Sequence, residues 1–138
     1  ATIYGIEVQE MIDKSQKQKV TELIIGMSSD PQFGPLLMFG MGGIYVNFLK
    51  DVSFRLGKFF TVEDSIKIIQ ETKSYALLRG VRGEPPSDIG LIQEVLQKVA
   101  ALVDDFQEDI LELDINPLLA FGKGEGVSAV DIKITIKL

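Results

Sequence analysis

ILELDINPLLAFGKGEGVSAVDIKITIK, residues 110–137, is the most informative stretch of the chain. Its first part alternates apolar residues from Leu111 to Ile115 with polar residues from Glu112 to Asn116, and residues 127–137 alternate in the same way. A period of two is typical of β-strands, which send successive side chains to opposite faces of a sheet. GKGEG between the two parts supplies a glycine-rich turn. The stretch therefore predicts an antiparallel hairpin.

The polar face of this hairpin is a candidate metal site. If the turn centres on Lys123 and Gly124, Asn116 lies directly across from Asp131, and side chains of opposed residues start about 5 Å apart on one face. Asp114 precedes Asn116 by two positions and shares that face. Carboxylate and amide oxygens, completed by water and substrate phosphates, are the ligands that Mg²⁺ prefers.

The same pattern allows a simpler interpretation. The polar side of a half-buried sheet normally faces solvent, and Lys133, opposite Asp114 in this register, could simply be its ion-pair partner. A slip of one residue would also send each side chain to the other face and break the pairing. The pattern alone leaves both interpretations open.

The first third of the chain reads as further strands. Residues 2–11 and the β-rich run at residues 23–27 predict two strands joined by a solvated turn. Residues 30–43, DPQFGPLLMFGMGG, predict a turn, a short buried strand and a glycine loop. Residues 44–55 are a further extended candidate. We interpret Met38 and Met41 as core residues rather than as the lining of a pocket.

Two helices are predicted in the middle. Thr61 and Asp64 have the spacing of a capping box, and Val62, Ile66 and Ile69 then recur at helical spacing. From Ser87, apolar residues form one stripe over about four turns; they are Ile89, Ile92, Val95, Leu96, Val99, Leu102 and Val103. The segment between, residues 76–86, predicts a loop. This order indicates one α+β domain over residues 1–138, with a mostly antiparallel sheet and helices packed on one face.

Composition excludes several kinds of chemistry. The 138 residues contain no Cys and no His, so the chain cannot build a thiolate or imidazole metal site, a Ser/His triad or a Cys nucleophile from its own residues. A net charge of −6 without a basic run argues against nucleic acid as a partner. Its apolar runs are far shorter than the roughly 20 residues that cross a membrane. We expect a cytoplasmic protein without a membrane partner.

Two further groups could bind an anion. The backbone N–H groups of Gly42 and Gly43 could approach a phosphate, or these glycines could merely turn a tight corner. Arg79 and Arg82, in the predicted loop, could clamp a phosphate by forked hydrogen bonds, although arginines in loops are usually solvated.

Several motifs in order resemble one family: VQEM (8–11), DPQFGPLLMFGMGG (30–43), RGEPPSDI (82–89), LDINPL (113–118) and VSAVDIKI (127–134). They are similar to the ATP-grasp region of the beta subunits of ADP-forming acetyl-CoA synthetases. These belong to the NDP-forming acyl-CoA synthetases, which are related to succinyl-CoA synthetase. The resemblance covers essentially the whole chain. It implies the C-terminal subdomain of an ATP-grasp fold.

The resemblance also implies a reaction and roles for individual residues. Acyl-CoA, phosphate and ADP would be interconverted with the acid, CoA and ATP by way of an acyl phosphate and a phosphohistidine. Asn116 and Asp131 would hold Mg²⁺ on the phosphates of ATP or ADP, with Asp114 as an auxiliary acid. The hinge strand beside adenine would comprise Gln9, Glu10, Met11 and Ile12. Glu22 would be the acid that faces ribose.

The chain departs from the family pattern in three ways. It has no His, so a CoA-binding alpha subunit or domain would supply the phosphohistidine in a hetero-oligomer. The lid that normally precedes VQEM is absent from this chain, so we expect the fragment alone not to turn over. Asn47 stands where the family commonly carries Glu, which is also compatible with an altered, inactive copy. The alternative function is a noncatalytic assembly or regulatory module derived from an ATP-grasp domain, for example within a protein acetyltransferase.

Overall fold

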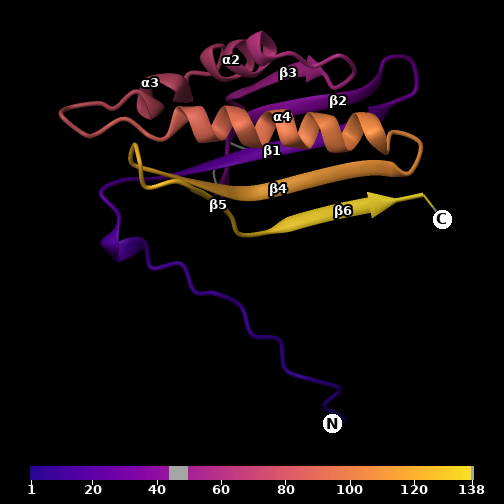
Figure 1. The fold of residues 1–138 in the computed structure, drawn as a ribbon, viewed down its shortest axis with the longest axis horizontal. Helices are drawn as coiled ribbons and strands as arrows, with labels where there is room; N and C mark the ends of the chain where they lie inside the picture. Colours follow the sequence, from indigo (N-terminus) through magenta and orange to yellow (C-terminus); the bar gives the residue numbers. More distant parts are fainter. Residues whose placement is uncertain (44–49, 138) are drawn as a thin grey trace.

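The sheet and its covering helices form two layers. The computed structural model describes residues 1–43 and 50–137 (Figure 1). The strands are β1 (Val20–Asp30), β2 (Gly34–Met41), β3 (Val52–Leu56), β4 (Ile110–Phe121), β5 (Val127–Ala129) and β6 (Ile132–Ile136). The helices are the 3₁₀ turn η1 (Lys14–Gln16), α2 (Val62–Gln70), α3 (Ser74–Leu78) and α4 (Ile89–Asp105). The strand order is β3-β2-β1-β4-β5, with β6 also on β4, and every pair is antiparallel. The α+β prediction is confirmed.

The core lies between the sheet and α4. The odd-numbered residues Leu23, Ile25 and Met27 of β1 are buried in one cluster with the inner stripe of α4. That stripe consists of Ile92, Leu96, Val99, Ala100 and Val103. The helix predicted from Ser87 is confirmed and begins at Ile89, because burial of a continuous apolar stripe stabilises the helical period. All the helices that pack on the sheet lie on this one face, as predicted (Figure 1). None of the helices within residues 1–43 and 50–137 has the length and apolar character needed to cross a bilayer.

The capping box of α2 is confirmed. Thr61 Oγ1 accepts from the N–H of Asp64 at 3.1 Å, and the N–H of Thr61 donates to Asp64 Oδ2 at 2.9 Å. The predicted apolar stripe is partly wrong, since Val62 is 61% exposed. The buried side chains of α2 are Ser65, Ile68 and Ile69. The helix is rotated so that this row faces the sheet and α4.

We expect the Asp64→Asn variant to be less stable than the parent by about 0.3–1 kcal/mol at pH 7, because it removes the carboxylate charge from the first turn of α2 while the Thr61 cap stays. The Thr61 hydroxyl and N–H both donate to Asp64 and hold the pKa of its carboxyl below the ordinary 3.8. A depressed folded-state pKa means that this contribution is complete above the unfolded-state pKa and is lost as pH falls through the folded-state pKa. Urea unfolding of both proteins at pH 7 and pH 3 measures the difference in their free energies of unfolding at each pH. A difference that stays equal at both pH values contradicts the prediction.

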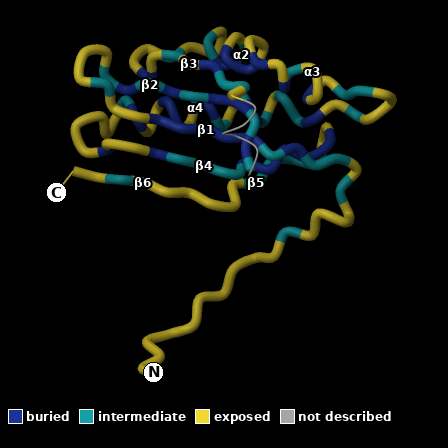
Figure 2. Tube along the Cα trace, turned by 180° about the vertical axis from the view of Figure 1, so that it is seen from behind, coloured by how far each residue is buried: buried dark blue, intermediate teal, exposed yellow. Residues whose placement is uncertain are grey.

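Residues 2–11 do not form the predicted strand. Within the described residues this segment has no partner strand, and without a ladder of inter-strand hydrogen bonds an apolar alternation has nothing to bury. Ile6 and Val8 are accordingly 89% and 90% exposed, and the N-terminal end of the arm lies far from the sheet (Figure 2). The strand predicted at residues 23–27 is confirmed and is longer, forming β1. The strand within residues 30–43 is β2.

The predicted loop at residues 76–86 is wrong over its first three residues, which belong to α3. The N-terminus of α3 is capped from a distance, because the Asp51 carboxylate accepts from the N–H groups of Lys73 and Ser74, both at 2.7 Å. Such a cap satisfies N–H groups that a helix end leaves free. Within the extended candidate at residues 44–55, β3 begins at Val52, and residues 44–49 lie outside the described residues.

The C-terminal hairpin forms with one interruption and one irregularity. The second half is split into β5 and β6, which both pair with β4. The register shifts between Ile110 and Glu112, so Leu111 is 41% exposed instead of facing the core with Leu113 and Ile115. β6 is an edge strand, and its isoleucines are about half exposed. The predicted pairing between the two halves is otherwise confirmed.

Candidate functional site

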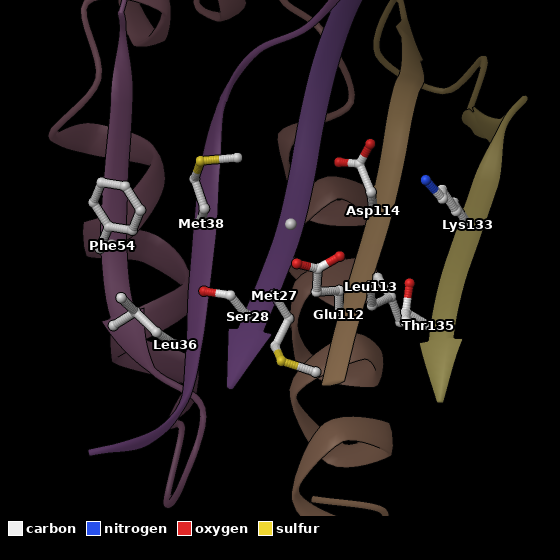
Figure 3. Close-up of a pocket in the computed structure, with 11 residues that line it drawn as sticks. Met27, Ser28, Leu36, Met38, Phe54, Glu112, Leu113, Asp114, Lys133 and Thr135 are labelled. Atoms are coloured by element: carbon white, nitrogen blue, oxygen red, sulfur yellow. The ribbon is translucent and has the colours of Figure 1, made fainter. Parts of the chain in front are cut away.

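The face of the sheet that α2 and α4 leave uncovered is called the open face here. Figure 3 shows it with the helices behind the strands. A shallow groove of about 300 Å³ crosses it. Leu36, Met38 and Phe54 form its apolar side, and the polar side carries Glu112, Asp114 and Lys133 (Figure 3). The interpretation of Met38 and Met41 as core residues is therefore wrong, since both are half-buried and Met41 lines another groove, whereas Phe39 is fully buried.

The structure places Asn116 across from Asp131, as the predicted turn requires. Leu118 pairs with Ala129 on one side of this position and Ile115 pairs with Ile132 on the other. The N–H of Asn116 donates to the carbonyl oxygen of Asp131 at 3.1 Å. Opposed residues of antiparallel strands project from the same face. The two residues predicted to bind metal are thus neighbours on adjacent stretches of chain.

The Asp114 carboxylate is affected by burial and by two charged neighbours, Asp131 and Lys133. Burial, and then the nearby Asp131 carboxylate, raise the pKa of Asp114 above its usual value, while Lys133 lowers it. Two carboxylates are therefore close enough to repel each other. A cation relieves such repulsion. Lys133 lies opposite Asp114 on β6 (Figure 3), but no ion pair joins them within the part of the chain that the structure describes.

The donor set suits Mg²⁺. Mg²⁺ is usually bound through one or two carboxylates together with substrate phosphates and water, rather than by a closed protein cage. Asp131, Asp114 and the Asn116 amide are hard oxygen donors of this kind. Residues 1–43 and 50–137 contain no cluster of three Asp, Glu, His or Cys side chains placed to hold an ion.

The N–H groups of both glycines already have acceptors in the protein. Gly42 donates to the carbonyl oxygen of Glu22 at 2.9 Å, and Gly43 donates to Asn116 Oδ1, also at 2.9 Å. These bonds direct both N–H groups to protein oxygens and give no support to their binding phosphate, which stays a prediction. They do bring the glycine loop against the candidate metal residue.

The two loop arginines, Arg79 and Arg82, do not line the groove on the open face. The guanidinium of Arg79 sits 5.9 Å from the centre of the Tyr75 ring, and Arg82 is exposed at the surface with a φ of 52°. Their binding of phosphate likewise stays a prediction.

The sequence analysis missed Lys19, which anchors this loop. Its side chain is 7% exposed, lies 3.5 Å from the carboxylate of Glu84 and donates to the carbonyl oxygens of Leu77 and Pro85. Nothing in the local sequence distinguishes Lys19 from the other lysines of KSQKQK, because all three partners are more than 50 positions away.

The predicted hinge residues line a second groove, of about 560 Å³. Gln9, Glu10, Met11 and Ile12 face the strand residues that follow Asn116 and precede Asp131, namely Pro117, Leu119, Ser128, Ala129 and Val130. Glu22 lies nearby on β1, where its carboxylate pairs with Lys14 at 2.8 Å. The groove predicted for the nucleoside therefore lies next to the residues predicted for the metal, because Pro117 and Val130 in its lining directly adjoin Asn116 and Asp131 in the chain.

Comparisons with known proteins identify the family of the chain. The chain matches the family model described as ATP-grasp domain over residues 1–136. It is 45% identical over 137 residues to the beta subunit of acetate–CoA ligase [ADP-forming] II from Pyrococcus furiosus, covering 99% of this chain and 56% of that one. It is 46% identical to acetate–CoA ligase [ADP-forming] I from Archaeoglobus fulgidus, covering 99% of this chain and 18% of that protein. The chain thus spans about half, or less, of the curated relatives it matches.

Solved structures that resemble this chain include related acetyl-coenzyme A synthetases. A structure from Pyrococcus horikoshii has a TM-score of 0.80 at 50% identity and covers 85% of this chain and 48% of that one. The dinucleotide-forming acetyl-coenzyme A synthetase 1 of Ca. Korarchaeum cryptofilum, in complex with coenzyme A and Mg-AMPPCP, has a TM-score of 0.77 at 43% identity, covering 85% and 53% of the two chains. The fold, the ordered motifs and the family match agree. The chain belongs to the ATP-grasp domain family.

Proposed function

We propose that this chain is the Mg·nucleotide-binding part of an ADP-forming acyl-CoA synthetase, most simply one acting on acetyl-CoA. The complete enzyme would interconvert acyl-CoA, ADP and phosphate with the acid, CoA and ATP. The names of the relatives at 45% and 46% identity support the reaction class. The observation that carries the proposal is the opposed pair Asn116 and Asp131 beside Asp114 on the open face.

In this proposal Asn116 and Asp131 hold Mg²⁺ through an amide and a carboxylate oxygen, with Asp114 as an auxiliary acid. When bound, the metal would offset the negative charge of the nucleotide phosphates during phosphoryl transfer. The protein contributes fixed donors on the sheet, so that little reorganisation is needed when the nucleotide arrives. Lys133, on the same face, adds a positive charge near the phosphates.

The nucleoside end of the nucleotide is assigned to the second groove. Gln9 to Ile12 would bind the adenine edge through their backbone, and the apolar wall made by Pro117 and Leu119 would pack against the ring. Glu22 would accept from the ribose hydroxyl groups. Its carboxylate is held by Lys14, which limits the entropy lost on binding.

The partner in this proposal is a CoA-binding subunit or domain that carries a phosphohistidine, because this chain has no His. The Korarchaeum structure is described with its phosphohistidine segment pointing towards the nucleotide binding site. The Pyrococcus furiosus relative is named as a beta subunit. Both descriptions support a hetero-oligomer. We expect this enzyme to be cytoplasmic.

The test of the function is the metal dependence of ADP binding. We expect calorimetry to show ADP binding to the chain, or to the complete synthetase, at least tenfold more tightly with Mg²⁺ than with EDTA, a difference of about 1.4 kcal/mol. Equal affinities in Mg²⁺ and EDTA would contradict the proposal. Absence of binding in the complete synthetase would favour the noncatalytic module instead. Asn47, which the sequence analysis found compatible with an altered, inactive copy, lies outside the described residues.

A further inference from the structure

Gly43 lies against two residues of the proposed site, Asn116 and Glu22. Its N–H donates to Asn116 Oδ1 at 2.9 Å, and a Cβ built on its α-carbon would lie 2.3 Å from Glu22 Oε2. We infer that Gly43 is a positioning residue that orients the Asn116 carboxamide and the Glu22 carboxylate together. This inference rests on the proposed function, because it assigns these two side chains to the metal and to the nucleoside.

The hydrogen bond selects one orientation of the Asn116 carboxamide. An amide has an accepting oxygen and a donating nitrogen at opposite ends, and rotation by half a turn exchanges them. The N–H of Gly43 is satisfied only when Oδ1 faces it. Oδ1 has a second lone pair, which is the one that a cation can use. In the reversed orientation the NH₂ group would face the Gly43 N–H, so that two donors would oppose each other.

The bare α-carbon of Gly43 sets the position of Glu22. Gly43 has a φ of 72°, in the region that favours glycine, and the Glu22 carboxylate occupies the space where a side chain would be. The other carboxylate oxygen, Oε1, pairs with Lys14 at 2.8 Å. The backbone of Glu22 is tied to the same loop, because its carbonyl oxygen accepts from Gly42. Glu22 is thus held between Lys14 and Gly43.

These contacts give the glycine loop a role that does not involve phosphate. Both of its N–H groups are used inside the protein, one on β1 and one on β4. The loop therefore joins the strand that carries Glu22 to the strand that carries Asn116. A shift of one side chain is transmitted to the other through Gly43, over a distance of a few bonds.

The test compares Gly43→Ala with Gly124→Ala. Gly124 has a φ of 84° with nothing within 4 Å of a built Cβ, so its alanine variant carries the same backbone strain without the steric contact. We expect Gly43→Ala to weaken Mg·ADP binding by at least tenfold relative to Gly124→Ala, measured by calorimetry on the complete synthetase. In the free chain, without metal or nucleotide, NMR should show the side-chain amide signals of Asn116 shifted by Gly43→Ala and unmoved by Gly124→Ala.

A second variant keeps the test decisive if Gly43→Ala does not fold. Glu22→Ala adds no atom and no backbone strain, and it should also shift the Asn116 amide signals in the free chain. Unmoved amide signals in both variants, or equal binding by Gly43→Ala and Gly124→Ala, would overturn the positioning role. Failure of the proposed function is distinguishable, because it would appear in the parent protein as equal ADP affinity in Mg²⁺ and in EDTA.

Discussion

Replacing Asn116 and Asp131 together by alanine is expected to weaken Mg·ADP binding to the complete synthetase on the order of 100-fold. Loss of groups that merely support a metal ligand commonly costs 10- to 100-fold in metal affinity, so removal of two proposed ligands should reach the upper end. Binding of ADP in EDTA should change little, because the nucleoside groove lies beyond these side chains. Calorimetry with and without Mg²⁺ measures both quantities.

Two controls separate ligation from charge and from folding. Asp105→Ala removes one carboxylate from the exposed end of α4 and should leave Mg·ADP affinity unchanged. Asp131→Asn keeps the shape of the side chain and removes only its charge, so it should reproduce a large part of the loss. If the double variant binds Mg·ADP as tightly as the parent, the metal assignment is wrong, whatever the family.

Local patterns predicted the elements that depend on local chemistry. The hairpin register followed from alternation and from a glycine-rich turn, and the structure retains it from the Glu112–Thr135 pair to the Ala120–Val127 pair. The stripe of α4 followed from its 3.6-residue period, and the start of α2 from two residues that cap each other. The capping residues of α2 and the paired residues of the hairpin lie within one turn or one hairpin of each other. The period of α4 is also a local pattern, although its buried stripe packs on strands far away in the sequence.

The errors have the opposite cause. The start of α3 depends on the Asp51 carboxylate, which lies more than 20 positions upstream. Residues 2–11 have the alternation of a strand but no partner among the described residues, and a strand needs a partner. The acceptor for the Gly43 N–H is 73 positions away. An anion and a distant amide oxygen satisfy the same N–H, so glycine spacing alone could not distinguish the two roles.

Gly42→Ala is expected to destabilise the fold by about 3 kcal/mol, the upper end of what overpacking usually costs. Gly42 does not have a positive φ, so conformational freedom is not the reason for glycine here. A Cβ would lie 2.3 Å from the carbonyl oxygen of Leu23 and 2.4 Å from its carbonyl carbon. These are backbone atoms of β1, which is paired on both sides, and they cannot move without breaking the ladders to β2 and β4.

Urea unfolding without Mg²⁺ or nucleotide distinguishes the two roles considered for this loop. If Gly42 served only to admit an anion, its alanine variant would unfold like the parent and lose only phosphate affinity. Gly34→Ala is the control for strain, since Gly34 has a φ of 78° with nothing within 4 Å, and it should cost about 1–2 kcal/mol. A larger loss for Gly42→Ala than for Gly34→Ala, despite the ordinary φ of Gly42, can come only from the close approach of the loop to β1. The same close approach brings Gly43 to Asn116. The stability of the fold and the geometry of the site therefore both depend on Gly42 and Gly43.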